Sequence, residues 1–231
     1  MNLGKKIVAI AAGAALVAGA GAMAATPATA ATKAKVGGTT VIVVPLALVG
    51  AASAAGVTIS PVEPSKAQAT ADSVGVTFPV TGPAMDGVLH HTGGLSFASS
   101  KTGITLTATK PQIEWATSGG DTASITVEIN GVPAASPFAA LNGTRVPIFT
   151  VNDFTMKGKW GKATKAGKAW KQTYTAVMTG DVTVVDNATV VDAVNGFMGA
   201  PIFTAGMDFG ALDSKSTTTH TCKTKKECSQ K

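Results

Sequence analysis

The chain has 231 residues, a formal net charge of +6 and a hydrophobic fraction of 45%. A chain of this length buries a sizeable apolar core, and one domain is expected beyond its N-terminal segment. That segment contains two lysines, so the remaining chain carries 6 − 2 = +4. A mild charge excess of this kind does not indicate a nucleic-acid partner.

The N-terminus has the organisation of a secretory signal peptide. Two lysines precede an uncharged apolar run over residues 7–25, and small residues follow it. This order predicts a signal peptide over residues 1–30, cleaved after Ala28-Thr29-Ala30, with Ala22-Met23-Ala24 as the alternative site. The uncharged stretch 36–62 is interrupted by Pro45, so we expect no membrane span after cleavage. The protein is then secreted or extracellular, with cell-wall association as one form of that location.

From Gly75 onward, short runs rich in Thr, Val and Ile alternate apolar and polar residues. The runs are GVTFPV, GGLSFAS, TGITLTATK, QIEW, ASITVEI, RVPIFTV, FTMKGKW, KQTYTAVM and DVTVV. Gly, Pro, Asn or Asp residues bound them, as is typical of consecutive antiparallel strands. Because their apolar faces must be covered, the pattern predicts an all-β fold, an antiparallel two-layer β-sandwich.

Two segments interrupt this pattern in a similar way, one near each end of the domain. TTVIVV is followed by PLALVGAASAAG and VTISPV, and DVTVV is followed by ATVVDAVNGFMG and IFTAGMDFG. Each predicts a strand, a short helix and a strand. A single domain is expected over residues 31–213, and the Thr-, Lys- and Ser-rich segment 214–231 is expected to be a disordered basic tail.

The tail holds the only two cysteines of the chain, Cys222 and Cys228. In an oxidising compartment an isolated pair at this spacing is expected to form a disulfide bond with itself. A metal or redox site would need further ligands or a C-x-x-C spacing, so no metal site is expected.

A lysine-rich hairpin is predicted over residues 154–178. FTMKGKW forms one strand, GKATKAGKA the turn and WKQTYTAVM the return strand, with Trp160 and Trp170 expected to pack across the strands or to stack on a carbohydrate. The lysines of this hairpin are Lys157, Lys159, Lys162, Lys165, Lys168 and Lys171. Outside the cytoplasm such a cluster meets anionic cell-wall polymers or lipid headgroups before nucleic acid, although a solvated loop explains the same composition.

No catalytic motif is present. Residues 94–98, GLSFA, are similar to a nucleophile elbow, but the strand pattern continues through Phe97 where an elbow requires a helix. The chain has no P-loop, no dinucleotide-binding fingerprint and no H-E-x-x-H motif, and its carboxylates are few and scattered. We therefore expect a protein that is not an enzyme and has no catalytic residue.

The stretch MDGVLHHTGGLSF holds two of the three histidines, His90 and His91. On a strand these neighbours point to opposite faces and cannot chelate one metal ion together, and His91 shares its face with Leu89. Two interpretations of His91 are open. It is a core histidine bonded to backbone or hydroxyl groups, or it faces a ligand at the mouth of an apolar pocket that Gly93 and Gly94 open.

GVLHHTGGLSF and the following strands, through PQIEW and SITVEI, resemble the strand–histidine–glycine core of HtaA-type domains. These are exported haem-uptake modules of Gram-positive cell envelopes with an antiparallel β fold. The resemblance covers about residues 75–152, and His91 aligns with the family histidine. In haem-binding members an upstream tyrosine ligates the iron and the histidine supports it by hydrogen bonding.

This sequence departs from that pattern, because its sole tyrosine, Tyr174, lies downstream of His91. The resemblance implies haem as the cofactor, and His91, Tyr174, Met85 or Met178 are able to ligate its iron. The spacing does not select among these four side chains.

The residues and the resemblance together predict a secreted or envelope-associated, non-catalytic binding module for haem or another apolar small molecule. Its predicted ligand-binding residues are His91, His90 and Tyr174. The alternative is a structural or adhesive envelope protein that binds anionic cell-wall polymers through the lysine-rich hairpin.

Overall fold

The computed structural model describes residues 34–84, 86–136 and 138–228. The predicted signal peptide, its cleavage site and Met85 lie outside these ranges. The strands are β1 Lys35–Pro45, β2 Val57–Val62, β3 Lys66–Ala69, β4 Ser73–Pro79, β5 Val88–His90, β6 Gly94–Ser99, β7 Thr105–Trp115, β8 Ala123–Asn130, β9 Arg145–Trp160, β10 Thr164–Ala166, β11 Ala169–Val184 and β12 Asp208–Cys222. The helices are α1 Leu46–Ala54, the 3₁₀ turn Ala139–Leu141, α2 Ala188–Met198 and α3 Lys225–Cys228.

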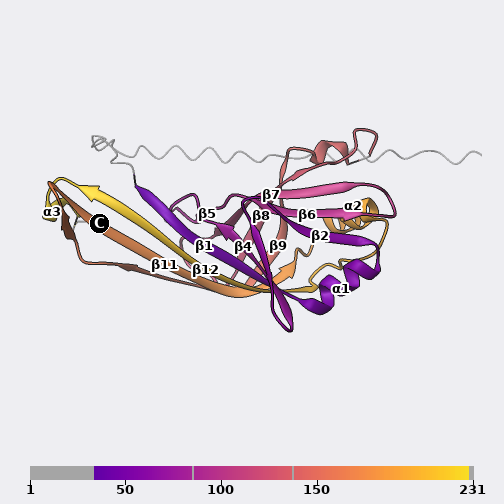
Figure 1. Ribbon diagram of the computed structural model, residues 1–231, viewed down its shortest axis with the longest axis horizontal. Coiled ribbons are helices and arrows are strands. Elements are labelled where there is room, and N and C mark those ends of the chain that lie inside the picture. The colour runs from indigo at the N-terminus through magenta and orange to yellow at the C-terminus, as the bar shows by residue number, and fades with distance from the viewer. Residues whose placement is uncertain (1–33, 85, 137, 229–231) are drawn as a thin grey trace, which may run out of the picture. The chain divides into compact units, whose positions relative to one another are not determined.

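The described strands form one antiparallel sheet, in the order β2-β6-β7-β8-β9-β11-β12-β1-β4-β3, with β5 paired to β7 and β10 to β11 (Figure 1). The predicted all-β antiparallel class is confirmed. The predicted two-layer sandwich is not made of two separate sheets, because all described strands belong to one sheet. The two ends of the path, β2 and β3, follow each other in the chain across residues 63–65 and contact each other, so the sheet nearly closes on itself.

Several predicted runs merge into longer strands. TGITLTATK and QIEW both belong to β7, and the break between them is a register shift beside Lys110, which has a φ of 50°. Asp153, with a φ of 49°, lies at the corresponding break within β9. Such bulges absorb one residue and bend the strand, which explains why alternation changes phase at these points without the strand ending.

The two predicted short helices are confirmed, each between two strands. Helix α1 begins directly after Pro45. Helix α2 begins at Asn187, whose side chain accepts a hydrogen bond from the Val190 backbone N–H, and it ends at Gly199 in the left-handed conformation. These are favourable capping residues at both ends of α2.

The expected disordered tail beyond Asp213 is instead strand through Cys222. Residues 214–219 of β12 pair with both β1 and β11, and β12 continues beside β11 to its end near α3 (Figure 1). Ser214, Ser216 and Thr218 alternate along β12 and are buried. Serine and threonine are typical of a solvated tail, which is why the segment was predicted to be disordered. Here their small side chains face the core.

The C-terminal cysteines pair as predicted, Cys222 with Cys228. This disulfide bond connects the end of β12 to α3. None of the helices in the described ranges is long and apolar enough to cross a membrane.

The lysine-rich hairpin is built differently from the prediction. Trp160 in β9 is paired with Tyr174 in β11, not with Trp170. The expected packing of the two tryptophans is therefore wrong, because β10 pairs with the start of β11 and forms a small hairpin of its own in the predicted turn. Trp170 is paired with Cys222, and the Lys225 amine lies 5.8 Å from the centre of its ring.

Candidate functional site

His91 lies in the core, directly after β5, with 5% of its surface exposed. Its Nδ1 lies 3.1 Å from the backbone oxygen of Pro111, and its Nε2 lies 2.6 Å from Thr40 Oγ1. The Thr40 hydroxyl also lies 2.7 Å from Ser214 Oγ. The histidine thus links β7 to β1 and β12 through a chain of side-chain hydrogen bonds.

The direction of these hydrogen bonds follows from the chemistry of the partners. A carbonyl oxygen only accepts, so Nδ1 carries the proton and donates to Pro111. Nε2 of the neutral ring then accepts from the Thr40 hydroxyl, which accepts in turn from Ser214. Desolvation by burial lowers the pKa of His91 from 6.5 to about 4, and the bond to Pro111 only partly opposes that shift.

The surroundings of His91 are those of a packed core. The cavity beside it has a volume of only about 10 Å³ and is lined mainly by apolar side chains, among them Ile113 and Leu212. Gly93 and Gly94 do not open an approach to it. A Cβ on Gly93 would meet Ser65, and one on Gly94 would meet the backbone of β7, so both glycines allow close packing.

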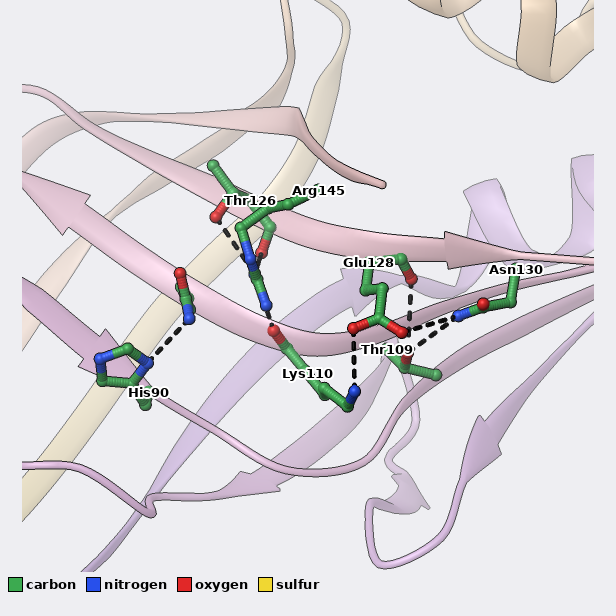
Figure 2. Close-up of polar contacts among 8 residues, drawn as sticks. His90, Thr109, Lys110, Thr126, Glu128, Asn130 and Arg145 are labelled. Atoms are coloured by element: carbon green, nitrogen blue, oxygen red, sulfur yellow. Dashed lines mark hydrogen bonds and ion pairs between the residues drawn. The ribbon is translucent and has the colours of Figure 1, made fainter. Parts of the chain in front are cut away.

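His90 points the other way and is exposed. Gln112 Nε2 donates to His90 Nδ1 over 2.8 Å, at the edge of a polar cluster on β7 and β8 (Figure 2). In this cluster Lys110 Nζ lies 2.9 Å from Glu128 Oε2. The hydrogen bonds from Lys110 and then Asn130 lower the pKa of Glu128. The cluster satisfies the backbone and side chains around the β7 bulge.

Tyr174 belongs to an aromatic cluster at the far end of the long strands. Its ring centre lies 5.1 Å from that of Trp160, and the ring of Trp160 lies 5.3 Å from that of His220. The three side chains come from β11, β9 and β12, and each is partly exposed. We call Trp160, Tyr174 and His220 the aromatic face.

A glycine makes room for the tyrosine. The phenol of Tyr174 lies over Gly158, where a Cβ would collide with the hydroxyl oxygen. Within the described part of the chain, that hydroxyl makes no hydrogen bond to another residue. The phenol oxygen is therefore held in place by packing of its ring against Gly158.

The sequence did not indicate His220 as a site residue. His220 follows Ser214, Ser216 and Thr218 at alternate positions of β12, and this alternation is the signal that places it on the inner face. The alternation did not lead to a strand prediction because the Thr-, Lys- and Ser-rich composition of the segment is that of a disordered tail. Met178, the remaining described candidate for an iron ligand, is fully buried in the apolar core.

The larger apolar cavity lies under helix α2 rather than beside His91. Its volume is about 50 Å³, and its lining includes Phe97, Phe149, Phe203 and Val191. No His, Tyr, Cys or Met side chain lines it. This cavity suits an apolar group and offers no ligand for iron.

The six predicted polyanion-binding lysines are all exposed. Lys157 and Lys159 lie on β9 and Lys171 on β11, whereas Lys162, Lys165 and Lys168 lie in and around β10. Across the described ranges, no group of three His, Cys, Asp or Glu residues is arranged to hold a metal ion.

Comparison with known proteins gives neither a matching family model nor a matching curated protein. Two solved structures from Corynebacterium glutamicum are similar to the chain. The haem-binding protein HtaB has 12% identity and a TM-score of 0.47, and the match covers 82% of this chain and 97% of that one. The C-terminal domain of HtaA has 12% identity and a TM-score of 0.44, with 80% and 99% covered. The chain is thus similar to structures of HtaB and HtaA, as the sequence resemblance led us to expect, and at TM-scores below 0.5 this similarity does not identify the residues that bind a ligand.

Proposed function

We propose that the chain is an exported, non-catalytic binding module that takes haem on the aromatic face formed by Trp160, Tyr174 and His220. The observation that carries this proposal is that the sole tyrosine and a histidine pack against the same tryptophan. The ring centre of Trp160 lies 5.1 Å from that of Tyr174 and 5.3 Å from that of His220. These residues come from three paired strands, which hold a binding surface more rigidly than loops do.

The chemistry of the three side chains fits haem. A tyrosine phenolate is one of the protein ligands that hold haem iron. The flat indole of Trp160 offers apolar area for stacking against a flat ring, and the His220 imidazole packs against that indole with its Nε2 buried. The resemblance to HtaA-type domains also implies a tyrosine ligand with a histidine near it. Here both residues lie at other sequence positions, and each ring contacts Trp160.

The other predicted ligand residues fit this role less well. Both ring nitrogens of His91 are used within the core, at 2.6 and 3.1 Å from their partners. His90 is exposed but is bonded to Gln112 in a polar cluster that has no aromatic ring. We assign His91 to the fold and Tyr174 to the ligand.

Titration with haemin tests the proposal. We expect the protein lacking residues 1–30 to shift and sharpen the Soret band of haemin, and Tyr174→Phe to abolish the shift while the far-UV circular dichroism spectrum stays unchanged. His220→Gln should weaken haemin binding and alter the spectrum. His90→Gln is the matched control, since it changes an exposed histidine away from the aromatic face, and it should bind as the parent protein does. A full Soret shift in Tyr174→Phe would refute the assignment.

A further inference from the structure

The strands that carry the aromatic face have a second, different surface on their other side. Residues directly opposite each other in an antiparallel sheet share a face. In register, Lys157 of β9 is paired with Val177 of β11, which is paired with Lys215 of β12. One step further along, Lys159, Thr175 and Thr217 form the next row.

The same face continues from these rows toward the hairpin. Thr173 is paired with Thr219, which is paired with Lys35 of β1, and Lys171 is paired with Thr221. We call this surface the lysine–threonine face, and its lysines are Lys35, Lys157, Lys159, Lys171 and Lys215. All five are exposed. Lys35 and Lys215 lie far from the hairpin in sequence and join it only through the sheet.

No ion pair among the described residues neutralises the positive charge of this face. The described residues form one ion pair, between Lys110 and Glu128, and it lies on β7 and β8, away from this face. The nearest carboxylate on the face is Asp213, two residues from Lys215 and paired with Thr179 and Val41. At the C-terminal end, the Glu227 carboxylate accepts hydrogen bonds from the backbone N–H groups of Lys223 and Thr224.

Carboxylates gather at the opposite end of the same strands. Asp72, Asp181 and Asp208 line an open groove beyond Asp213. The face therefore has a cationic half, toward the hairpin, and an acidic half. An anionic partner is attracted to the first half and repelled from the second.

Threonine hydroxyls fill the space between the lysines. Thr173 and Thr219 are joined by a hydrogen bond of 3.0 Å between their hydroxyls, and the Thr217 hydroxyl donates to the Gly37 backbone oxygen over 3.3 Å. One large apolar side chain is prominent on the face, Val177, which is 38% exposed. The surface is rich in hydrogen-bonding groups and offers little for insertion into a lipid bilayer.

From this arrangement we infer that the lysine–threonine face binds an extended anionic polymer carrying phosphate or carboxylate groups. Neighbouring strands lie about 5 Å apart, so Lys157 and Lys215 are separated by about 10 Å across β11, while Lys157 and Lys159 are about 7 Å apart along β9. A flat array of charges at such intervals matches a linear polymer better than a small anion, which needs a concave site. This site is independent of the proposed haem site, because it occupies the reverse side of the same strands.

Binding of fluorescently labelled inorganic polyphosphate to the protein without residues 1–30 tests the inference. The face variant carries Lys157→Gln, Lys159→Gln and Lys215→Gln. The matched control carries Lys162→Gln, Lys165→Gln and Lys168→Gln, which removes the same charge from the turn around β10. Only lysines that lie against the bound polymer contribute to affinity, so we expect the face variant to lose about tenfold or more in affinity and the turn variant less than about threefold. Binding of the parent protein should weaken as salt rises.

Three results would overturn the inference. Equal losses in the two variants would mean that net charge alone is responsible, and unchanged affinity in the face variant would remove the site. Tight binding to phosphatidylglycerol vesicles that polyphosphate does not compete away would assign the face to a lipid surface. Haemin titration of both variants should match the parent, which separates failure of this site from failure of the haem site.

Discussion

His91 Nε2 and Thr40 Oγ1 lie 2.6 Å apart in the core, and this contact joins the segment after β5 to β1. Because His91 also donates to Pro111 and Thr40 also bonds to Ser214, removal of one group leaves polar atoms without partners. Buried polar groups that lose their partners cost far more than the same groups in water. The histidine pair of the sequence therefore contains one residue that stabilises the fold and one that is exposed.

The depressed pKa of His91 predicts a pH dependence of stability. Above pH 6.5 the imidazole is neutral in both the folded and the unfolded chain, and its pKa of about 4 in the folded state keeps it neutral there as the pH falls. Between these values the unfolded chain binds a proton that the folded chain does not, so the free energy of unfolding decreases as pH falls from 6.5 to 4. The shift is equivalent to about 3 kcal/mol. Urea unfolding at a series of pH values measures it.

His91→Gln is the variant that isolates this effect, because an amide is able to bond to Pro111 and Thr40 but does not titrate. Its unfolding free energy should lose most of the slope between pH 6.5 and 4, whereas the exposed control His90→Gln should keep it. An identical slope in His91→Gln and the parent would show that other groups cause the dependence.

Thr40→Val should destabilise the protein by about 1–3 kcal/mol, because His91 Nε2 loses its donor and the Ser214 hydroxyl loses its acceptor in a buried site. The neighbouring Thr39 is exposed on the other face of β1. Thr39→Val is therefore the matched control and should change stability by less than about 0.5 kcal/mol. Thermal or urea unfolding compares the two, and equal effects would argue against the buried network.

Gly158→Ala should disturb the aromatic face. The added methyl group would occupy the position of the Tyr174 hydroxyl, so the ring must move or the strands must separate, at a cost of about 1–3 kcal/mol. Haemin binding should weaken with it. At Gly161 the closest atom to an added Cβ is the Thr173 backbone oxygen, at 3.4 Å, so Gly161→Ala is the tolerated control. Near-UV circular dichroism reports the packing of Trp160 and Tyr174, and an unchanged spectrum in Gly158→Ala would contradict the placement of Tyr174.

Local patterns were sufficient to predict most of the strands between Gly75 and Val184, the two short helices and the orientation of His91 relative to His90, since these depend on alternation and on capping residues near in sequence. The partners of His91 were not predictable in this way. Thr40 and Ser214 lie 51 and 123 residues from it and reach it only through the closing of the sheet. The pairing of Tyr174 with Trp160 depends on the register of β9 and β11, which a bulge shifts between Thr179 and Asp181.

Composition misled the prediction of the C-terminal segment, and truncation tests the corrected structure. A chain ending at Asp213 would lose the part of β12 that lies between β1 and β11, together with the buried Ser214, Ser216 and Thr218. It would also leave the backbone groups of two strands unpaired, so we expect it to unfold or to aggregate. A chain ending at Cys222, with Cys222→Ser, keeps β12 and loses only α3 and the disulfide bond, which closes a short loop and contributes about 2 kcal/mol. This second variant should stay folded with a lower melting temperature, and a stable, native-like chain ending at Asp213 would show that the segment is a dispensable tail after all.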